Sequence, residues 1–273
     1  MTDQPCVAGL LVHERGLADG PTLLLLHGLS DSGLCWPDGV GRWRHDYRIV
    51  APDARRHGES PRFDLATSGS NRFDDMVADV VVLLERLADE GGATPILVGH
   101  ASGAGVAATV LTRRPDLLRA AVLEDPPWST GARSDATDTI QQWAQGFRDH
   151  CHEALVTGRL EHPLWPDVEF LPWAAAKARL DPSLTDRGQI ASQAPWIQTA
   201  EAITRPTLVV TGGRQEAVLV SASSRQQLAD LGNRYIEVEV VPGAGHTVRR
   251  DYADAYHQIV DPWISRQFAG AGS

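Results

Sequence analysis

Lysine and cysteine are scarce in this chain of 273 residues. Lys177 is its only lysine, so 24 of its 25 basic residues are arginines, a skew that we attribute to GC-rich coding rather than to function. The three cysteines, Cys6, Cys35 and Cys151, form no disulfide framework. No apolar run reaches the roughly 18 residues of a membrane span, and the N-terminal pattern is that of a strand rather than a signal peptide. These absences predict a cytoplasmic protein with reduced thiols and no membrane partner.

Positive charge is also in short supply, because 35 acidic residues face 25 basic ones and the formal net charge is −10. A chain this acidic has no general attraction for phosphate backbones, so we expect no nucleic-acid partner. The hydrophobic fraction of 42% and the charged fraction of 22% are those of a globular protein and exclude a disordered chain. The length suits one large α/β domain or two domains.

Short apolar runs alternate with segments of helical periodicity along most of the chain. A fully apolar run is typical of a strand buried on both faces, and the alternation predicts an α/β fold with a mostly parallel central sheet and helices on both faces. The expected strands span residues 23–26, 47–51, 95–98, 120–123, 206–210 and 235–241, and the expected helices span residues 73–87, 103–113, 221–231 and 253–268.

Residues 128–203 break this alternation, with many prolines, no convincing strand, and helical stretches at 136–150 and 171–179. We interpret them as a helical cap inserted into a core formed by residues 1–127 and 204–273. Tryptophan is concentrated there. Large aromatic faces suit a flat, mostly apolar ligand, although helix packing alone explains any single one. We predict that this set contributes to substrate binding: Trp128, Trp143, Trp165, Trp173 and Trp196.

The most informative stretch is Ile-Leu-Val-Gly-His-Ala-Ser-Gly-Ala-Gly at residues 96–105. An apolar strand, a sharp turn of small residues and a helix are the pattern of a nucleophile elbow, G-x-nucleophile-x-G. Gly99 and Gly103 take the two glycine positions, which puts Ala101 at the nucleophile. Alanine cannot attack a substrate, and Ser102 is a poor substitute because one step along the elbow turns its side chain away.

This elbow resembles that of the α/β-hydrolase superfamily, in which Gly-His-Ser-x-Gly is common. Three further stretches resemble family motifs in the family's order: the oxyanion loop at residues 26–29, a D-x-R-G-H-G-x-S turn at residues 52–60 with Arg56 in place of the glycine, and the catalytic histidine loop at residues 242–246. The resemblance implies the α/β-hydrolase fold and esterase or lactonase chemistry. It also implies an oxyanion hole made by the backbone N–H groups of Leu29 and Ser102.

A serine nucleophile needs a base, and the base needs an orienting carboxylate. His246 is the expected base, because it stands on a Gly-Ala-Gly turn after a predicted strand. By resemblance the usual acid position falls on Gln215, but haloalkane dehalogenases, zearalenone lactonases and cofactor-free dioxygenases place the acid after the preceding strand. Asp125 stands there and is the expected acid. Glu216 is the runner-up, and Glu124 is expected to point to the opposite face.

The remaining histidines are not expected to transfer protons. His27, His57 and His100 resemble structural positions of the family, while His13, His45, His162 and His257 are expected to face solvent. We predict no metal site, since neighbours in the run at residues 150–153 point in different directions on a helix. No cofactor is predicted, because residues 99–105 lack the signatures of a P-loop or a dinucleotide site.

Three functions remain open. The first is a serine hydrolase that cleaves a carboxylic ester or lactone of a bulky hydrophobic or aromatic kind by a Ser-His-Asp triad, with this chain as a Ser→Ala variant impaired in turnover. The second is a cofactor-free dioxygenase or lyase that uses His246 and its acid as a base. The third is a non-catalytic ligand-binding protein, which a native Ala101 would favour. A monomer or a homodimer fits each of them.

Overall fold

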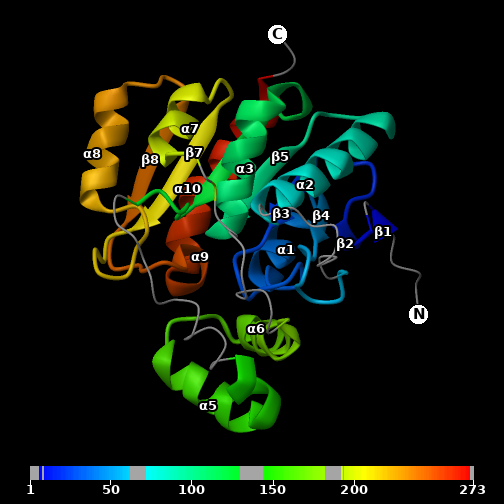
Figure 1. Cartoon of the computed structure of the whole chain (residues 1–273), viewed down its shortest axis with the longest axis vertical. Coiled ribbons are helices and arrows are strands. Elements are labelled where there is room, and N and C mark those ends of the chain that lie inside the picture. The colour runs from blue at the N-terminus through cyan, green and yellow to red at the C-terminus, as the bar shows by residue number, and fades with distance from the viewer. Residues whose placement is uncertain are drawn as a thin grey trace.

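A single sheet organises the molecule. In the part of the chain that the structure describes, eight strands follow the order β1-β2-β4-β3-β5-β6-β7-β8, with helices on both faces (Figure 1). All pairs from β4 to β8 are parallel, and β1 and β2 complete the sheet by antiparallel pairing. The predicted α/β fold is therefore confirmed. The structure is a computed structural model that describes residues 6–7, 9–61, 72–129, 144–181, 192 and 194–270.

Six strands and four helices agree with the expected spans to within two residues at each end, and the remaining elements were not predicted at the observed bounds. The strands are β1 (Cys6–Val7), β2 (Leu10–Gly16), β3 (Thr22–Leu26), β4 (Arg48–Pro52), β5 (Ile96–His100), β6 (Ala120–Glu124), β7 (Thr207–Gly212) and β8 (Ile236–Val241). The helices are α1 (Pro37–Trp43), α2 (Arg72–Asp89), α3 (Ser102–Arg113), α5 (Cys151–Glu161), α6 (Asp167–Arg179), α7 (Trp196–Ala202), α8 (Ala222–Leu231), α9 (Val248–Asp251) and α10 (Ala253–Ala269), with a short 3-10 helix at Pro115–Leu117.

The core lies on both sides of the sheet. Every residue of β3, β5, β6 and β7 is buried, as expected of strands covered on both faces. Helices α2, α3, α7 and α8 pack their apolar side chains on one face, and α1, α9 and α10 pack theirs on the other. These layers hold the strands rigid, so the loops that leave their carboxyl ends are well positioned.

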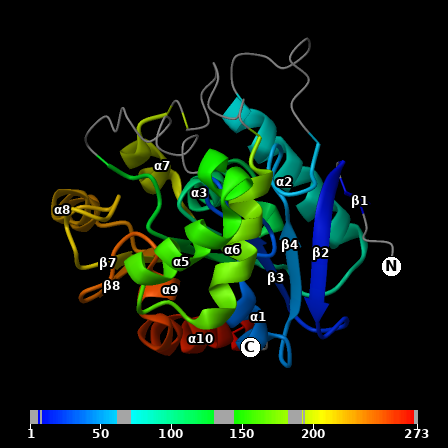
Figure 2. The same cartoon turned by 90° about the horizontal axis from the view of Figure 1, so that it is seen from below.

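Helices α5 and α6 lie together beyond the carboxyl ends of the strands, apart from the layers that cover the sheet (Figures 1 and 2). They share a small aromatic core of their own around Phe147, Trp165, Phe170 and Trp173. The described part of residues 128–203 contains no strand. Helix α6 includes the expected stretch 171–179, whereas most of 136–150 lies outside the described residues. That residues 128–203 form an inserted cap stays a proposal.

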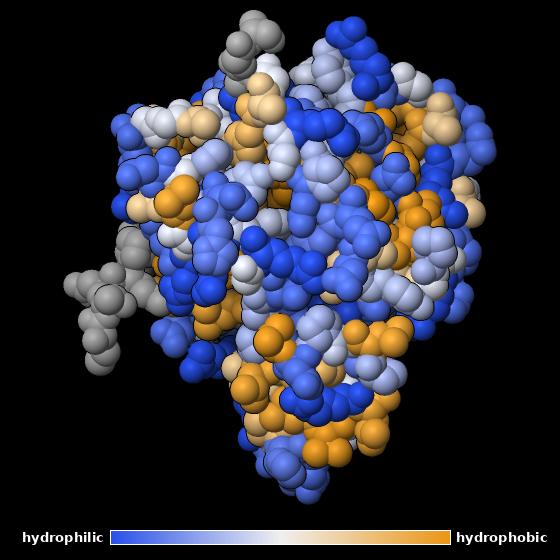
Figure 3. Space-filling view, turned by 180° about the vertical axis from the view of Figure 1, so that it is seen from behind, coloured by the Kyte–Doolittle hydropathy of each residue, from blue (hydrophilic) through white to orange (hydrophobic). Residues whose placement is uncertain are grey.

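The surface formed by α5, α6 and the loop between them mixes polar side chains with exposed apolar ones, as the lower part of Figure 3 shows. Its large exposed apolar side chains are Val156, Leu160, Leu164, Val168 and Leu171. None of the helices in the described ranges is both long enough and apolar enough to cross a membrane.

Two histidines differ from expectation. His13 is buried with its Nε2 3.1 Å from Asp53 Oδ1, and His257 is buried with its Nδ1 2.9 Å from Asp261 Oδ1. The expectation that they face solvent is wrong, because a carboxylate supplied by the fold pairs with one ring nitrogen of each and makes burial acceptable. His45 is exposed and His162 is half-buried.

Candidate active site

Strained backbone is concentrated at the carboxyl edge of the sheet. Among the described residues, four that are not glycine have positive φ: Ser30 (67°), Arg56 (65°), Ala101 (49°) and Asp125 (41°). They follow β3, β4, β5 and β6, which are neighbours in the sheet. This conformation costs about 1–2 kcal/mol per residue, and it clusters where a structure serves a function. In open parallel sheets ligands bind at this edge, so we place the candidate site there.

Ala101 stands on the turn between β5 and α3 with φ 49° and ψ −116°. Its neighbours must be small, because a Cβ on Gly103 would lie 2.2 Å from the carbonyl oxygen of Leu26 and a Cβ on Gly99 would lie 2.7 Å from Cα of Ala104. The Ala101 side chain is 7% exposed. Its methyl group therefore lies at the tip of a sharp strand-to-helix turn, the place from which a nucleophile acts in an elbow.

His246 and Asp125 are in direct contact, although 121 positions separate them. His246 Nδ1 lies 2.6 Å from Asp125 Oδ2, the carboxylate is fully buried, and the imidazole is 34% exposed. Three further donors surround the carboxylate: the Thr211 hydroxyl at 2.8 Å and the N–H groups of Leu219 at 2.8 Å and Val220 at 3.0 Å. These bonds fix the carboxylate, which in turn fixes the ring. No hydrogen bond joins His246 Nε2 to a described residue, so this nitrogen remains available to a substrate.

The other acids considered for this role lie elsewhere. Glu216 is exposed on the turn after β7, and the Gln215 side chain accepts a hydrogen bond from the N–H of Ala222 at 2.7 Å. Glu124 is buried and accepts from the N–H of Arg249 at 2.8 Å and from its guanidinium at 2.9 Å. The carboxylate that contacts His246 is therefore that of Asp125.

The remaining histidines at this edge support loops. His27 Nε2 accepts from the N–H of Ala54 at 2.9 Å, and His57 Nε2 accepts from the N–H of Ser30 at 3.3 Å. Burial lowers the pKa of His57 to about 3 and holds the pKa of His100 well below its usual value. These rings are thus uncharged at neutral pH and hold hydrogen bonds rather than exchange protons.

The amides expected to form the oxyanion hole flank the elbow. The N–H groups of Leu29 and Ser102 make no hydrogen bond within the described residues. Leu29 lies in a turn closed by a 3.1 Å hydrogen bond from the N–H of Asp31 to the carbonyl of Gly28. Gly28 must be glycine there, since a Cβ would lie 2.7 Å from His100 Nδ1. The oxyanion role of these amides stays a prediction.

Four of the five tryptophans singled out in the sequence are described, and all four pack against other rings. Trp128 and Trp196 are stacked with ring centroids 5.8 Å apart, and Trp165 and Trp173 meet edge to face at 5.6 Å. Trp143 lies outside the described residues. The contribution of these tryptophans to substrate binding stays a prediction.

Sequence reasoning missed a cluster of buried charges beside the site, with Asp31 at its centre. The Asp31 carboxylate lies 3.0 Å from Arg250, 3.3 Å from Lys177 and 3.7 Å from Arg249, and Arg250 also pairs with Glu169 at 2.8 Å. These cations hold the pKa of Asp31 far below its usual value despite burial. Two clues were present in the sequence: the lone lysine and the pair of arginines that closely follows His246.

Each of the three cations around Asp31 also lies over a tryptophan ring, and for Arg249 this ring is that of Trp36, 4.2 Å from its centroid. Arg250 lies 4.9 Å from the Trp165 ring centroid and Lys177 lies 4.9 Å from that of Trp173. A desolvated cation–π contact is worth about 2 kcal/mol. At least one face of each ring is therefore occupied by a buried cation.

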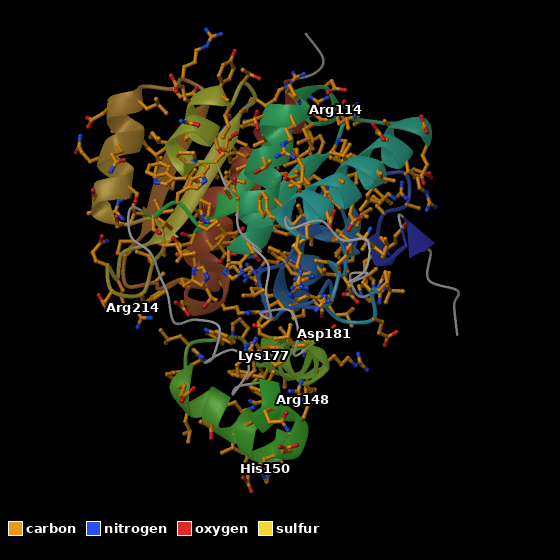
Figure 4. All side chains as sticks on the ribbon, in the orientation of Figure 1. Arg114, Arg148, His150, Lys177, Asp181 and Arg214 are labelled. Atoms are coloured by element: carbon orange, nitrogen blue, oxygen red, sulfur yellow. The ribbon has the colours of Figure 1, made fainter. Side chains whose placement is uncertain are left out.

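Figure 4 shows Lys177 and Asp181 where α6 meets the core, with Arg148 and His150 farther out.

Neither a reactive thiol nor a metal-binding group is found near this site among the described residues. Burial raises the pKa of Cys35, close to Asp31, to about 11, so this thiol is not a ready nucleophile. Within the ranges that the structure describes, no group of three or more His, Cys, Asp or Glu side chains is placed to hold a metal ion.

Comparison with known proteins identifies related sequences and folds. The model of the alpha/beta hydrolase family matches residues 23–259. The 2-(acetamidomethylene)succinate hydrolase of Mesorhizobium japonicum is 30% identical over 257 residues, which cover 88% of this chain and 85% of that protein. Several solved structures share the fold at lower identity.

Two of these structures illustrate the range. A serine-to-alanine variant of the N-formylmaleamic acid deformylase from Pseudomonas putida has a TM-score of 0.74 at 20% identity and covers 94% of this chain and 98% of its own. A malate-bound esterase from Thermogutta terrifontis has a TM-score of 0.68 at 20% identity, with 94% and 93% covered. At such identities these likenesses show the fold alone.

Proposed function

The chain belongs to the alpha/beta hydrolase family, and from that premise we propose that its site is built for serine-type hydrolysis of an acyl compound. The observation that carries this proposal is the 2.6 Å contact between His246 and a fully buried Asp125 at the sheet edge that also bears the strained elbow. A base, its orienting acid and a nucleophile position thus share one edge, and this chain has alanine at the third. We propose that Ala101 impairs turnover and that a serine there would restore it.

With serine at position 101, each group has a defined task. The hydroxyl attacks the carbonyl carbon while His246 Nε2 accepts its proton and then donates it to the leaving group. Asp125 holds the imidazole and stabilises the imidazolium that forms. The amides of Leu29 and Ser102 stabilise the oxyanion. Water then attacks the acyl-enzyme with His246 again as base, which regenerates the serine.

We propose a bulky hydrophobic or aromatic ester or lactone as the substrate class, on the basis of the aromatic side chains in residues 128–203. The related hydrolase of Mesorhizobium japonicum is named for an acetamidomethylene succinate, so its substrate combines an amide with carboxylates. A substrate panel should therefore contain aromatic esters, lactones and acylamino dicarboxylates. A clear preference for short acetate esters would contradict the proposed class.

The decisive experiment is Ala101→Ser, with hydrolysis followed across that panel. Loss of the serine costs a well-studied serine protease about 10⁶-fold in kcat, so we expect a gain of at least about 10⁴-fold with the best substrate. Ala101→Gly is the matched control, because it changes the same turn without adding a hydroxyl, and it should gain nothing. Absence of any gain with serine would refute the proposal.

The His246–Asp125 pair in a chain without a nucleophile favours one second candidate, a cofactor-free dioxygenase or lyase. In that chemistry the imidazole deprotonates the substrate and no covalent acyl-enzyme forms. The chain with its own Ala101 should then consume oxygen with an aromatic hydroxy-ketone, and His246→Ala should abolish the consumption. If Ala101→Ser gains no hydrolysis and oxygen consumption is also absent, a non-catalytic ligand-binding protein remains.

A further inference from the structure

The turn that carries the Leu29 amide has a strained backbone and is held by side chains from other segments. Its third residue, Ser30, has a φ of 67°, a conformation that suits glycine or asparagine rather than serine at this place in a turn. A strained residue stays in place only when its surroundings over-determine it. The contacts around Ser30 therefore decide where the neighbouring Leu29 N–H points.

His57 binds the Ser30 N–H, and Lys177 contacts the turn from helix α6. Its ammonium lies 3.3 Å from Ser30 Oγ, 3.5 Å from the Ser30 carbonyl oxygen and 3.3 Å from Asp31 Oδ1. An ammonium carries three donors, and three oxygens of this one turn surround it. The side chain is 3% exposed. In a chain that uses arginine at 24 of 25 basic positions, the single lysine stands at this site, and lysine differs from arginine in presenting a compact cation with three donors.

The same end of α6 contacts the turn and its neighbour in two more ways. The Leu29 side chain packs against Ala144 and Leu180, and the N–H of Asp181 donates to the carbonyl of Arg56 at 3.4 Å, the strained residue after β4. The strained turns at Ser30 and Arg56 are thus both held by α6 and the two residues that follow it.

We propose that Lys177 is a positioning residue, which holds the turn from Gly28 to Asp31 and thereby sets the Leu29 amide for oxyanion stabilisation. Seating of helix α6 on the core and completion of the oxyanion hole are then one event. This inference rests on the proposed hydrolase function, because the oxyanion exists only in acyl transfer. The effect of Lys177 on the turn itself does not depend on turnover.

The test replaces Lys177→Met in the Ala101→Ser protein, with Arg179→Met as the matched control. Arg179 lies two residues farther along α6 and makes an exposed ion pair with Glu59 at 3.6 Å, away from the turn. Lys177→Met should leave the fold intact, since Asp31 keeps Arg250 at 3.0 Å and Arg249 at 3.7 Å. Loss of an oxyanion donor lowers kcat by about 10²–10³-fold, so we expect kcat to fall about 100-fold with little change in KM. Arg179→Met should change neither.

A second measurement uses the chain with its own Ala101. Amide hydrogen exchange at Ser30 and Asp31, whose N–H groups are bonded to His57 Nε2 and the Gly28 carbonyl, should accelerate at least tenfold in Lys177→Met and not in Arg179→Met. Unchanged exchange would overturn the proposal, as would a kcat that falls no more than in the control. If Ala101→Ser shows no hydrolysis, the proposed function fails, and the exchange experiment alone decides whether Lys177 holds the turn.

Discussion

Replacing the acid beside the base provides the sharpest check on the proposed chemistry. Asp125 Oδ2 faces both His246 Nδ1 and the N–H of Leu219, while Oδ1 faces the Thr211 hydroxyl and the N–H of Val220. In Asp125→Asn, the amide –NH₂ must point at one of these two pairs of donors. If the –NH₂ group points toward His246, the imidazole must take the wrong tautomer. If it points toward Val220, the amide oxygen still accepts from His246, but this oxygen carries no negative charge. Either way the negative charge beside the base is lost.

The magnitude follows from that charge. A carboxylate and an imidazolium whose charges are about 4 Å apart attract by about 4 kcal/mol at an effective dielectric constant of 20, and about 1.4 kcal/mol is worth a factor of ten. This attraction corresponds to about 10³-fold in kcat. The wrong tautomer adds to it, and the equivalent change in a serine protease costs about 10⁴-fold. We therefore expect a loss of 10³–10⁴-fold in the Ala101→Ser background.

The assay is kcat for the best substrate, with stability followed by urea unfolding. One buried N–H or O–H donor then faces the new –NH₂ group and has no acceptor. This lowers the free energy of unfolding by about 1–3 kcal/mol, so the variant should remain folded. Glu216→Gln is the control and should retain activity within about twofold, because Glu216 is exposed on the turn after β7. A loss below tenfold in Asp125→Asn, or an equal loss in Glu216→Gln, would refute the reasoning.

Two further predictions concern stability. The pKa of His57 is about 3 in the folded chain against 6.5 when unfolded, so between pH 6.5 and 4.5 the unfolded chain binds a proton that the folded chain refuses. Protonation is worth about 1.4 kcal/mol per pH unit once the unfolded histidine is mostly protonated, and at pH 6.5 it is only half protonated. This one group should therefore lower the free energy of unfolding by about 2 kcal/mol over that interval. Urea unfolding at the two pH values checks this, and the loss should be smaller in His57→Gln. Gly103→Ala should lower the melting temperature sharply or prevent folding, since its Cβ would lie 2.2 Å from a backbone oxygen. In contrast, Gly41→Ala in open space on helix α1 should stabilise the protein by about 0.5–1 kcal/mol; thermal scans compare the two, and equal behaviour would contradict the prediction.

The sequence alone predicts six of the strands and four of the helices to within two residues, because buried strands and amphipathic helices leave local signals. Short apolar runs such as Thr22–Leu26 and the spacing of apolar residues in Arg72–Asp89 need no knowledge of distant partners. The elbow glycines are equally local, since the turn at Ala101 constrains its immediate neighbours. His246 was found through its glycine-rich turn, which is also a local signal.

Contacts between distant segments left no such signal. The burial of His13 depends on a carboxylate 40 positions away. The ring of His257 contacts Asp261 on its own helix, but its Nε2 also lies 3.4 Å from Asp38, which is far away in the sequence. Lys177 reaches Asp31 across 146 positions, and the sequence gives no period that links them. The tryptophans of the helical segment were noticed for their number, whereas the cations that cover Trp165 and Trp173 appear only once the helices are placed.

The sequence by itself determined an α/β protein with a nucleophile elbow that holds alanine, because strand, turn and helix propensities act over a few residues. The tertiary structure decided which carboxylate meets His246, and it brought four strained turns to one edge of the sheet. It also balanced a group of buried charges against one another beside that edge. The physical reason is that a buried charge is tolerated only beside its partner, and partners are chosen by distance in space rather than by position along the chain.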